Sequence, residues 1–137
     1  RKTANLDPSV MTLISPVLMS ELTVSQRKDH FMIHPLFAFL EEHELSTFGA
    51  LCIAATMNIY EENDCVFEEK TPAGIMYITV HGVFQLTRKD RPGEAFCFSK
   101  PQWLSEVSLF MKGAHNSTLH TRTFAEAYAL QRDDIVA

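Results

Sequence analysis

Residues 102–120, with the sequence QWLSEVSLFMKGAHNSTLH, gather side chains that can bind an anion. Small hydroxyl residues cluster here, and a turn of this kind leaves backbone amides that can donate hydrogen bonds to a phosphate group. The stretch contains no arginine, and Lys112 is its single fixed cation. A buried phosphate requires compensating donors. The stretch therefore indicates a phosphate pocket, or the remnant of one.

Other kinds of chemistry find less support in the sequence. No nucleophile can be placed beside a base and no carboxylate dyad is evident, so we do not expect an enzyme. His30 and His34 have the i, i+4 spacing of helical metal ligands, but no third ligand is evident and we expect no metal site. Cys52, Cys65 and Cys97 are odd in number and lack CxxC spacing, which indicates reduced cytosolic thiols.

The composition is typical of one globular domain with a hydrophobic core. Of the 137 residues, 46% are hydrophobic and 21% are charged. The formal net charge of −5 argues against nucleic-acid binding, which needs a basic surface. No apolar run approaches the roughly 20 residues of a membrane span, and RKTANLDPSV lacks the apolar core of a signal peptide. A longer membrane protein could still carry this segment.

Helices are expected in the first part of the chain, after a mixed lead-in over residues 1–13. Ser15 and Pro16 predict a helix start, because serine caps helices and proline is tolerated at the first position. Leu18, Leu22 and Phe31 would form its buried side. Their spacing is imperfect, so we expect this helix to pack on a partner outside the segment.

A break and a second helix should follow. Pro35 is expected to end the first helix, and the apolar residues after it predict a short turn. Ser46 or Thr47 would cap the next helix. That helix follows the i, i+3, i+4, i+7 pattern with Phe48, Leu51, Cys52 and Ala55.

From Met57 onward the apolar pattern has a period of two, which predicts short strands. In IMYITVHGVFQLT, Met76, Ile78 and Val80 alternate with Tyr77 and Thr79. The glycine of this run should mark a bulge or a tight bend. Further strands are expected at DCVFEE, AFCFS, STLHTRT and EAYALQ, with RKDRPGE as a polar turn and a helix starting at Asp133 or Asp134. Many short strands joined by tight turns favour a barrel or a jelly roll.

The stretch NDCVFEEKTPAGIMYITVHGVFQL resembles the cyclic nucleotide-binding domains of voltage-gated-type channels. The family has P-G-D-x-I, a glycine-containing turn, then Y-x-I-x-x-G, and Asp64, Val66, Tyr77 and Gly82 fall at the expected spacing. WLSEVSLF is similar to the family's F-G-E-I-A-L-L, with Glu106 at the glutamate. HNSTL is similar to R-T-A-T-V, and AYALQRDDI to the closing strand and the step into the next helix.

The upstream stretch PVLMSELTVSQRKDHFMIHPLF resembles the linker that joins such domains to a channel pore. The resemblance implies a lead-in and linker helix at residues 1–34 and a cyclic nucleotide-binding-like domain at residues 35–137, without its C-terminal lid helix. It implies an α+β, mainly β fold, in which helices flank an eight-stranded jelly-roll-like β-barrel.

The resemblance also implies a ligand site, a cassette for cAMP or cGMP. Glu106 would accept a hydrogen bond from the ribose, while hydroxyls and amides would surround the phosphate. Glu106 could instead accept backbone hydrogen bonds, Ser117 and Thr118 could be ordinary strand residues, and His115 could be a solvated loop residue or a pH sensor. The candidate binding residues are Ser105, Glu106, Val107, Ser108, His115, Ser117 and Thr118.

The chain departs from the family pattern where the phosphate would bind. Ser105 replaces the cassette glycine, Pro101 replaces the glycine before the cassette, and His115 replaces the arginine. A neutral histidine offers one donor and no fixed charge. Losing a buried charge-assisted bond costs about 2–5 kcal/mol, so a micromolar site would move towards millimolar affinity.

Two functions follow from the resemblance. The first is the cytoplasmic regulatory domain of a voltage-gated-type ion channel, with weak or lost cyclic nucleotide binding. Its partners would be the pore domain of the same chain and neighbouring subunits of a homo-oligomer. The second is a working cAMP or cGMP sensor of a channel, a transporter or a kinase regulatory subunit. No cofactor is expected beyond a weakly bound cyclic nucleotide.

Overall fold

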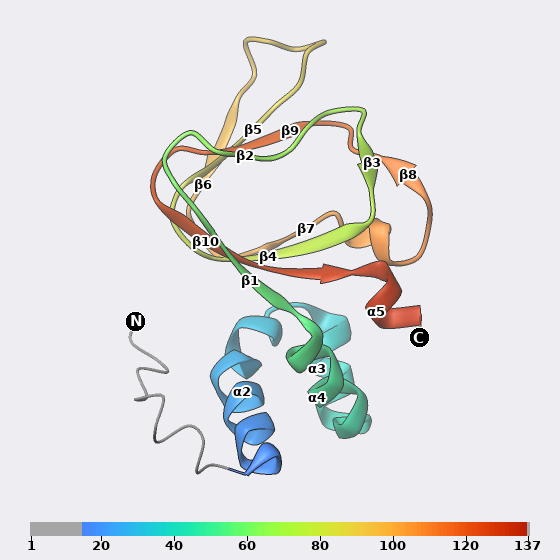
Figure 1. Ribbon diagram of the computed structural model, residues 1–137. Helices are drawn as coiled ribbons and strands as arrows, with labels where there is room; N and C mark the ends of the chain where they lie inside the picture. Colours follow the sequence, from blue (N-terminus) through green and yellow to red (C-terminus); the bar gives the residue numbers. More distant parts are fainter. Residues whose placement is uncertain (1–14, 137) are drawn as a thin grey trace. The chain divides into compact units, whose positions relative to one another are not determined.

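The computed structural model describes residues 15–136, and Figure 1 shows the order of its helices and strands. The chain divides into two compact units, residues 1–53 and residues 54–137. The lead-in expected over residues 1–13 lies outside the described residues. The division after residue 34 followed a family resemblance rather than compactness, and it stays a prediction.

The described part of the first unit is helical. Its helices are α2 (Pro16–Phe31), α3 (Pro35–His43) and α4 (Leu45–Ala54). The start of α2 is confirmed, because the Leu18 N–H donates a hydrogen bond to Ser15 Oγ at 3.2 Å. Of the predicted buried side, Phe31 is fully buried, whereas Leu18 and Leu22 are exposed. The partner expected to cover these leucines stays a prediction.

Two polar contacts join α2 to the other helices. Arg27 Nη1 donates a hydrogen bond to the Cys52 carbonyl oxygen of α4 at 2.7 Å. Lys28 Nζ lies 3.2 Å from the Glu41 carboxylate of α3. The first of these satisfies a carbonyl in the last turn of α4, where no backbone donor follows within the helix.

The predicted break before Pro35 is confirmed, because α2 ends at Phe31, but the short turn expected after Pro35 was wrong. The residues after it form the nine-residue helix α3 rather than a short turn. His34 caps this helix, since its Nδ1 accepts a hydrogen bond from the Leu36 N–H at 3.1 Å, and Pro35 suits the first helical position. The caps predicted at Ser46 or Thr47 were also wrong, because α4 already begins at Leu45.

The second unit is built from short strands. They are β1 (Thr56–Tyr60), β2 (Cys65–Phe67), β3 (Pro72–Ala73), β4 (Ile75–His81), β5 (Phe84–Thr87), β6 (Phe96–Phe98), β7 (Trp103–Leu104), β8 (Gly113–Ala114), β9 (Thr118–Thr121) and β10 (Ala125–Gln131). The 3-10 turn η1 (Glu106–Leu109) follows β7, and the short helix α5 (Arg132–Val136) follows β10.

These strands form two antiparallel four-stranded sheets, in the orders β1-β10-β4-β7 and β2-β9-β5-β6. Figure 1 shows the two sheets as facing layers, with the two-stranded ribbon β3-β8 at one end. The mainly β, jelly-roll-like fold class is therefore confirmed. Within the described residues the strands form separate sheets rather than one closed barrel.

Apolar side chains from both sheets fill the space between them. The buried cluster consists of Phe84, Phe98, Leu119, Ala125 and Ala127. The rings of Phe84 and Phe98 stack with centroids 5.6 Å apart. This core holds β5, β6, β9 and β10 in place, and with them the loops at the ribbon end.

The alternation predicted along β4 is absent from its burial pattern. Met76, Tyr77, Ile78 and Thr79 are all buried. β4 pairs with β10 and β7 along its two edges, and its four consecutive buried residues show that side chains on both of its faces are covered. A strand of this kind carries a continuous buried run rather than a half-buried alternation.

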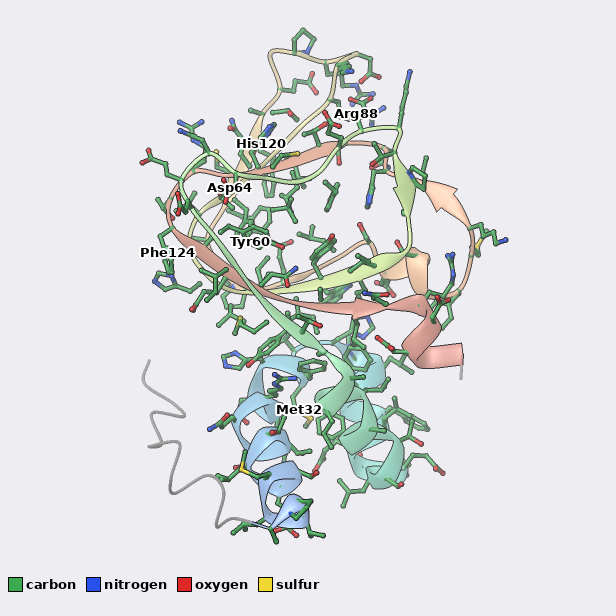
Figure 2. The ribbon with its side chains drawn as sticks, viewed as in Figure 1. Met32, Tyr60, Asp64, Arg88, His120 and Phe124 are labelled. Atoms are coloured by element: carbon green, nitrogen blue, oxygen red, sulfur yellow. The ribbon has the colours of Figure 1, made fainter. Side chains whose placement is uncertain are left out.

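In the turn before β2, Glu62 and Asn63 stand where the family pattern has proline and glycine. Asn63 adopts a φ of 67°, a left-handed conformation that asparagine tolerates. The Asp64 N–H donates to Thr121 Oγ1 at 2.9 Å, and the Thr121 hydroxyl donates to the Glu61 carbonyl at 2.6 Å. Figure 2 labels Asp64 in this turn. These contacts close the turn without the proline and glycine of the family pattern.

No helix within residues 15–136 has the length and apolar character needed to cross a membrane.

Replacing Gly82 by alanine should destabilise the protein by at least about 2 kcal/mol. Gly82 has a φ of 102°, and a Cβ there would lie 2.5 Å from the Phe124 carbonyl oxygen and 2.6 Å from Ala125 Cβ. Chemical denaturation measures the change in free energy of unfolding. Gly93→Ala is the matched control, because a Cβ at Gly93 meets nothing within 4 Å. Equal effects of the two substitutions would contradict the steric argument.

Candidate ligand-binding site

A cavity of about 500 Å³ lies beside η1 in the second unit. Apolar side chains form much of its wall, among them Phe67, Leu86 and Trp103. The polar residues that line it are Ser105, Glu106, Ser108, His115, Asn116 and Ser117. A volume of this size falls within the range of small-molecule sites, roughly 300–1,000 Å³.

The cavity gathers most of the candidate residues from the sequence. Ser105, Glu106, Ser108, His115 and Ser117 all line it, and the backbone of Val107 lies in η1. Thr118 is not among the lining residues. Its Oγ1 instead accepts a hydrogen bond from the Glu69 N–H at 2.9 Å. Asn116 lines the cavity although the sequence had not singled it out. Its position between His115 and Ser117 was the available signal.

The turn that carries the cassette begins with a strained residue. Ser105 adopts a φ of 63°, in the left-handed region that favours glycine. The Ser108 N–H then donates to the Ser105 carbonyl at 3.0 Å and closes the 3-10 turn. Ser108 is buried, with 3% of its surface exposed. The backbone thus adopts a glycine-like conformation at a position where the chain has serine.

Glu106 has a partner that neither sequence interpretation anticipated. The indole N–H of Trp103 donates to Glu106 Oε1 at 2.7 Å. This bond joins the first residue of β7 to the first residue of η1 and fixes the direction of the carboxylate. One indole bond does not saturate a carboxylate, which can accept several hydrogen bonds. Glu106 therefore keeps the chemistry required to accept from a sugar hydroxyl.

His115 is more ordered than the solvated loop residue that the sequence suggested. Its ring stacks on Phe67 with centroids 3.9 Å apart and an interplanar angle of 11°. Its backbone N–H donates to the Thr71 carbonyl at 3.0 Å, and its carbonyl accepts from the Lys70 N–H at 2.7 Å. Its Nδ1 lies 3.4 Å from Ser105 Oγ. Burial lowers the pKa of His115 below its ordinary value, so the ring is neutral at pH 7.

Within residues 15–136, the cavity lining contains no fixed positive charge. Among the described lining residues, Glu106 and His115 are the ionisable ones, and neither lysine nor arginine is present. Lys112, the cation noted in the sequence, is exposed and is not part of the lining. An anion bound here would be held by neutral hydrogen-bond donors rather than by a fixed positive charge.

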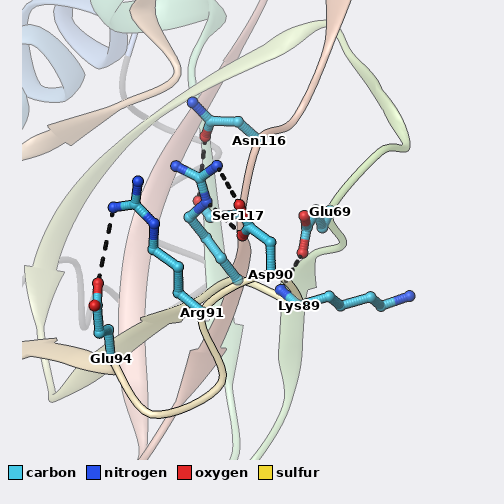
Figure 3. A network of polar contacts seen from close by, with 8 residues as sticks. Glu69, Lys89, Asp90, Arg91, Glu94, Asn116 and Ser117 are labelled. Atoms are coloured by element: carbon cyan, nitrogen blue, oxygen red, sulfur yellow. Dashed lines mark hydrogen bonds and ion pairs between the residues drawn. The ribbon is translucent and has the colours of Figure 1, made fainter.

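A second cavity, of about 510 Å³, adjoins the first. His115 and Asn116 line both cavities. Basic residues line the second one, but Arg88 donates two hydrogen bonds to Asp90, each at 3.1 Å. Figure 3 shows this network, in which the Lys89 N–H also donates to Glu69 Oε1 at 2.8 Å. The Arg88 guanidinium is therefore paired with Asp90, and none of the described lysine and arginine residues of the second cavity lines the first one.

No metal site is formed by the described residues, in which no group of three or more His, Cys, Asp or Glu side chains could hold an ion. Cys52 is buried, Cys65 and Cys97 are exposed, and all three are free thiols.

Comparisons with known proteins agree with this geometry. A model of the family described as cyclic nucleotide-binding domain matches residues 57–137. No curated protein matches the chain. Among solved structures, the chain is similar to the N-terminal domain of a transcriptional regulator from Streptomyces coelicolor A3(2). The TM-score is 0.66 and the identity 23%, over 77% of this chain and 76% of that one. This likeness concerns the fold. Neither comparison supports the expectation that the domain belongs to a channel.

Replacing Ser105 by glycine should raise the free energy of unfolding by about 0.5–1 kcal/mol. A left-handed residue with a Cβ costs about 1–2 kcal/mol, and the greater freedom of glycine in the unfolded chain offsets part of the gain. Chemical denaturation measures the difference. Ser99→Gly is the control, because Ser99 is exposed and lies outside the left-handed region. Ser99→Gly should lower stability, and a similar loss for Ser105→Gly would show that Ser105 is unstrained.

The stability of the protein should contain a pH-dependent contribution from His115. Its pKa is lower in the folded chain than in the unfolded one because of burial. The contribution is therefore present above about pH 6.5 and is lost as pH falls through the folded pKa. In denaturation experiments between about pH 7.5 and 5, wild type should lose stability more steeply than His115→Gln. Equal slopes, or an NMR titration of His115 with an unshifted midpoint, would contradict this expectation.

Proposed function

Because the chain belongs to the cyclic nucleotide-binding domain family, we propose that it is a regulatory domain that senses cAMP or cGMP with low affinity. The observation that carries this proposal is the single cavity in which Glu106, Ser108 and Ser117 lie together. A regulatory rather than a catalytic role agrees with this lining, since a binding pocket of hydroxyls and one carboxylate needs no reacting nucleophile.

Each group in the cavity has a role in the proposed complex. Glu106, oriented by Trp103, accepts a hydrogen bond from the ribose hydroxyl. The hydroxyls of Ser108 and Ser117 donate to the phosphate oxygens, together with backbone amides of η1. His115 offers at most one ring donor, and as a neutral group it leaves the phosphate charge uncompensated. The low affinity follows from this missing charge.

The protein that carries the domain is a further part of the proposal. A cytoplasmic regulatory domain of a channel or transporter fits the linker-like helix α2, on which Val17 is 69% and Leu18 48% exposed. These side chains would pack on the membrane part of the same chain or on a neighbouring subunit. In this alternative the domain would act on the membrane part through changes in helix packing, without binding a nucleotide. Its degenerate cassette would then be a remnant.

Restoring the missing charge tests the proposal directly. Calorimetry on the full-length protein should give dissociation constants for cAMP or cGMP between tens of micromolar and millimolar. His115→Arg should tighten binding at least about tenfold, because a guanidinium offers a paired, charged donor. His120→Arg is the control, since His120 lies on β9 outside the cavity lining.

Absence of binding to both wild type and His115→Arg at millimolar nucleotide would overturn the sensor and favour the nucleotide-free module. Equal tightening by His120→Arg would show that a general electrostatic effect, rather than the cassette, is responsible.

A further inference from the structure

One side chain connects the cassette turn to the helix that follows the sheets. Arg132, the first residue of α5, donates from Nη1 to the Ser108 carbonyl at 3.0 Å and to the Met111 carbonyl at 3.2 Å. Its backbone N–H donates to the Gly74 carbonyl at 3.0 Å. Three segments far apart in the sequence, the turn between β3 and β4, the η1 region and the start of α5, thus meet at Arg132.

The two carbonyl oxygens that accept hydrogen bonds from Arg132 need a donor. Ser108 lies in η1 and Met111 follows it, and the last carbonyls of a short helical turn have no backbone partner within that turn. A guanidinium satisfies both with charge-assisted hydrogen bonds, which are stronger than bonds between neutral groups. The arrangement of the turn therefore depends on a charge supplied from α5.

Residues of the same turn line the candidate ligand site. Ser108 and Met111 both line the cavity of about 500 Å³, whereas Arg132 is not part of its lining. Arg132 thus acts on the cavity through the backbone of η1 and not by contact with a ligand. It is a different cation from the arginine that the family places at position 115.

We propose that Arg132 is a positioning residue that holds η1 in its ligand-binding arrangement and couples it to α5. The coupling rests on the proposed function in one respect only, namely that the cavity binds a cyclic nucleotide. Coupling is reciprocal, so a group that lets α5 order the turn also lets an occupied cavity order α5. The helix after the sheets then reports the state of the cassette.

Hydrogen exchange of the full-length protein without ligand tests the positioning role. Arg132→Gln should speed the exchange of peptides that cover residues 105–112 and 132–136 at least about threefold, with the core strands unchanged. Arg132→Lys, which keeps a charged donor, should restore most of the protection. Arg122→Gln is the matched control, since Arg122 is exposed and donates to the Gln85 side chain at 2.9 Å. It should leave both regions at wild-type rates.

Wild-type exchange in Arg132→Gln would overturn the proposal. So would faster exchange spread over the whole second unit and not rescued by lysine, because that result indicates a general structural role.

Addition of saturating cAMP tests the coupling. In wild type and Arg132→Lys, cAMP should slow exchange over residues 132–136, and in Arg132→Gln it should not, with a dissociation constant raised at least about threefold. Equal protection of residues 132–136 in wild type and Arg132→Gln would overturn the coupling. If wild type binds neither cAMP nor cGMP, the proposed function fails, while the ligand-free experiment still decides the role of Arg132.

Discussion

The candidate site depends on one strained turn that its neighbours must hold in place. Ser105 enters η1 with a φ of 63°, which for a residue with a Cβ costs about 1–2 kcal/mol. Such a conformation persists only where the surrounding structure determines it. On one side, β7 pairs Leu104 with Tyr77 and Trp103 with Ile78 of β4. On the other side, η1 is bound to the guanidinium of Arg132. The turn is thus fixed from both ends by bonds that no ligand supplies.

A turn built in this way can order donors, but it does not supply charge. The cavity beside η1 has Glu106 and His115 as its described ionisable groups, and burial keeps the imidazole neutral by lowering its pKa. A phosphate that enters this space loses hydrogen bonds to water and gains hydrogen bonds from neutral donors. These stabilise it less than a charged donor would. Geometry and affinity are therefore separable here. In the proposed complex the backbone of the turn sets the geometry, and the neutral side chain of His115 limits the affinity.

The fold could be predicted from the sequence further than the site could. The short strands expected after Met57 and the tight bend at Gly82 depend on local backbone rules, and the structure confirms both. The predicted alternation along β4 was wrong, because its burial depends on what covers the sheet rather than on the local sequence. The helix after Pro35 was missed because an imidazole cap is not a typical start signal. The contact of Arg132 with Ser108 joins residues far apart in the chain, which no local pattern reveals.

Position 115 shows why the ligand chemistry of such a domain can change while its fold persists. The backbone N–H and carbonyl of His115 pair with Thr71 and Lys70, and any residue other than proline at this position can make these two bonds. The side chain instead faces the cavity and stacks on Phe67. A substitution here keeps the backbone pairing between the two loops, while it changes the stacking on Phe67 and what the cavity offers to an anion. Because the fold uses the main chain and the ligand uses the side chain, a nucleotide pocket can lose its phosphate clamp without losing its shape.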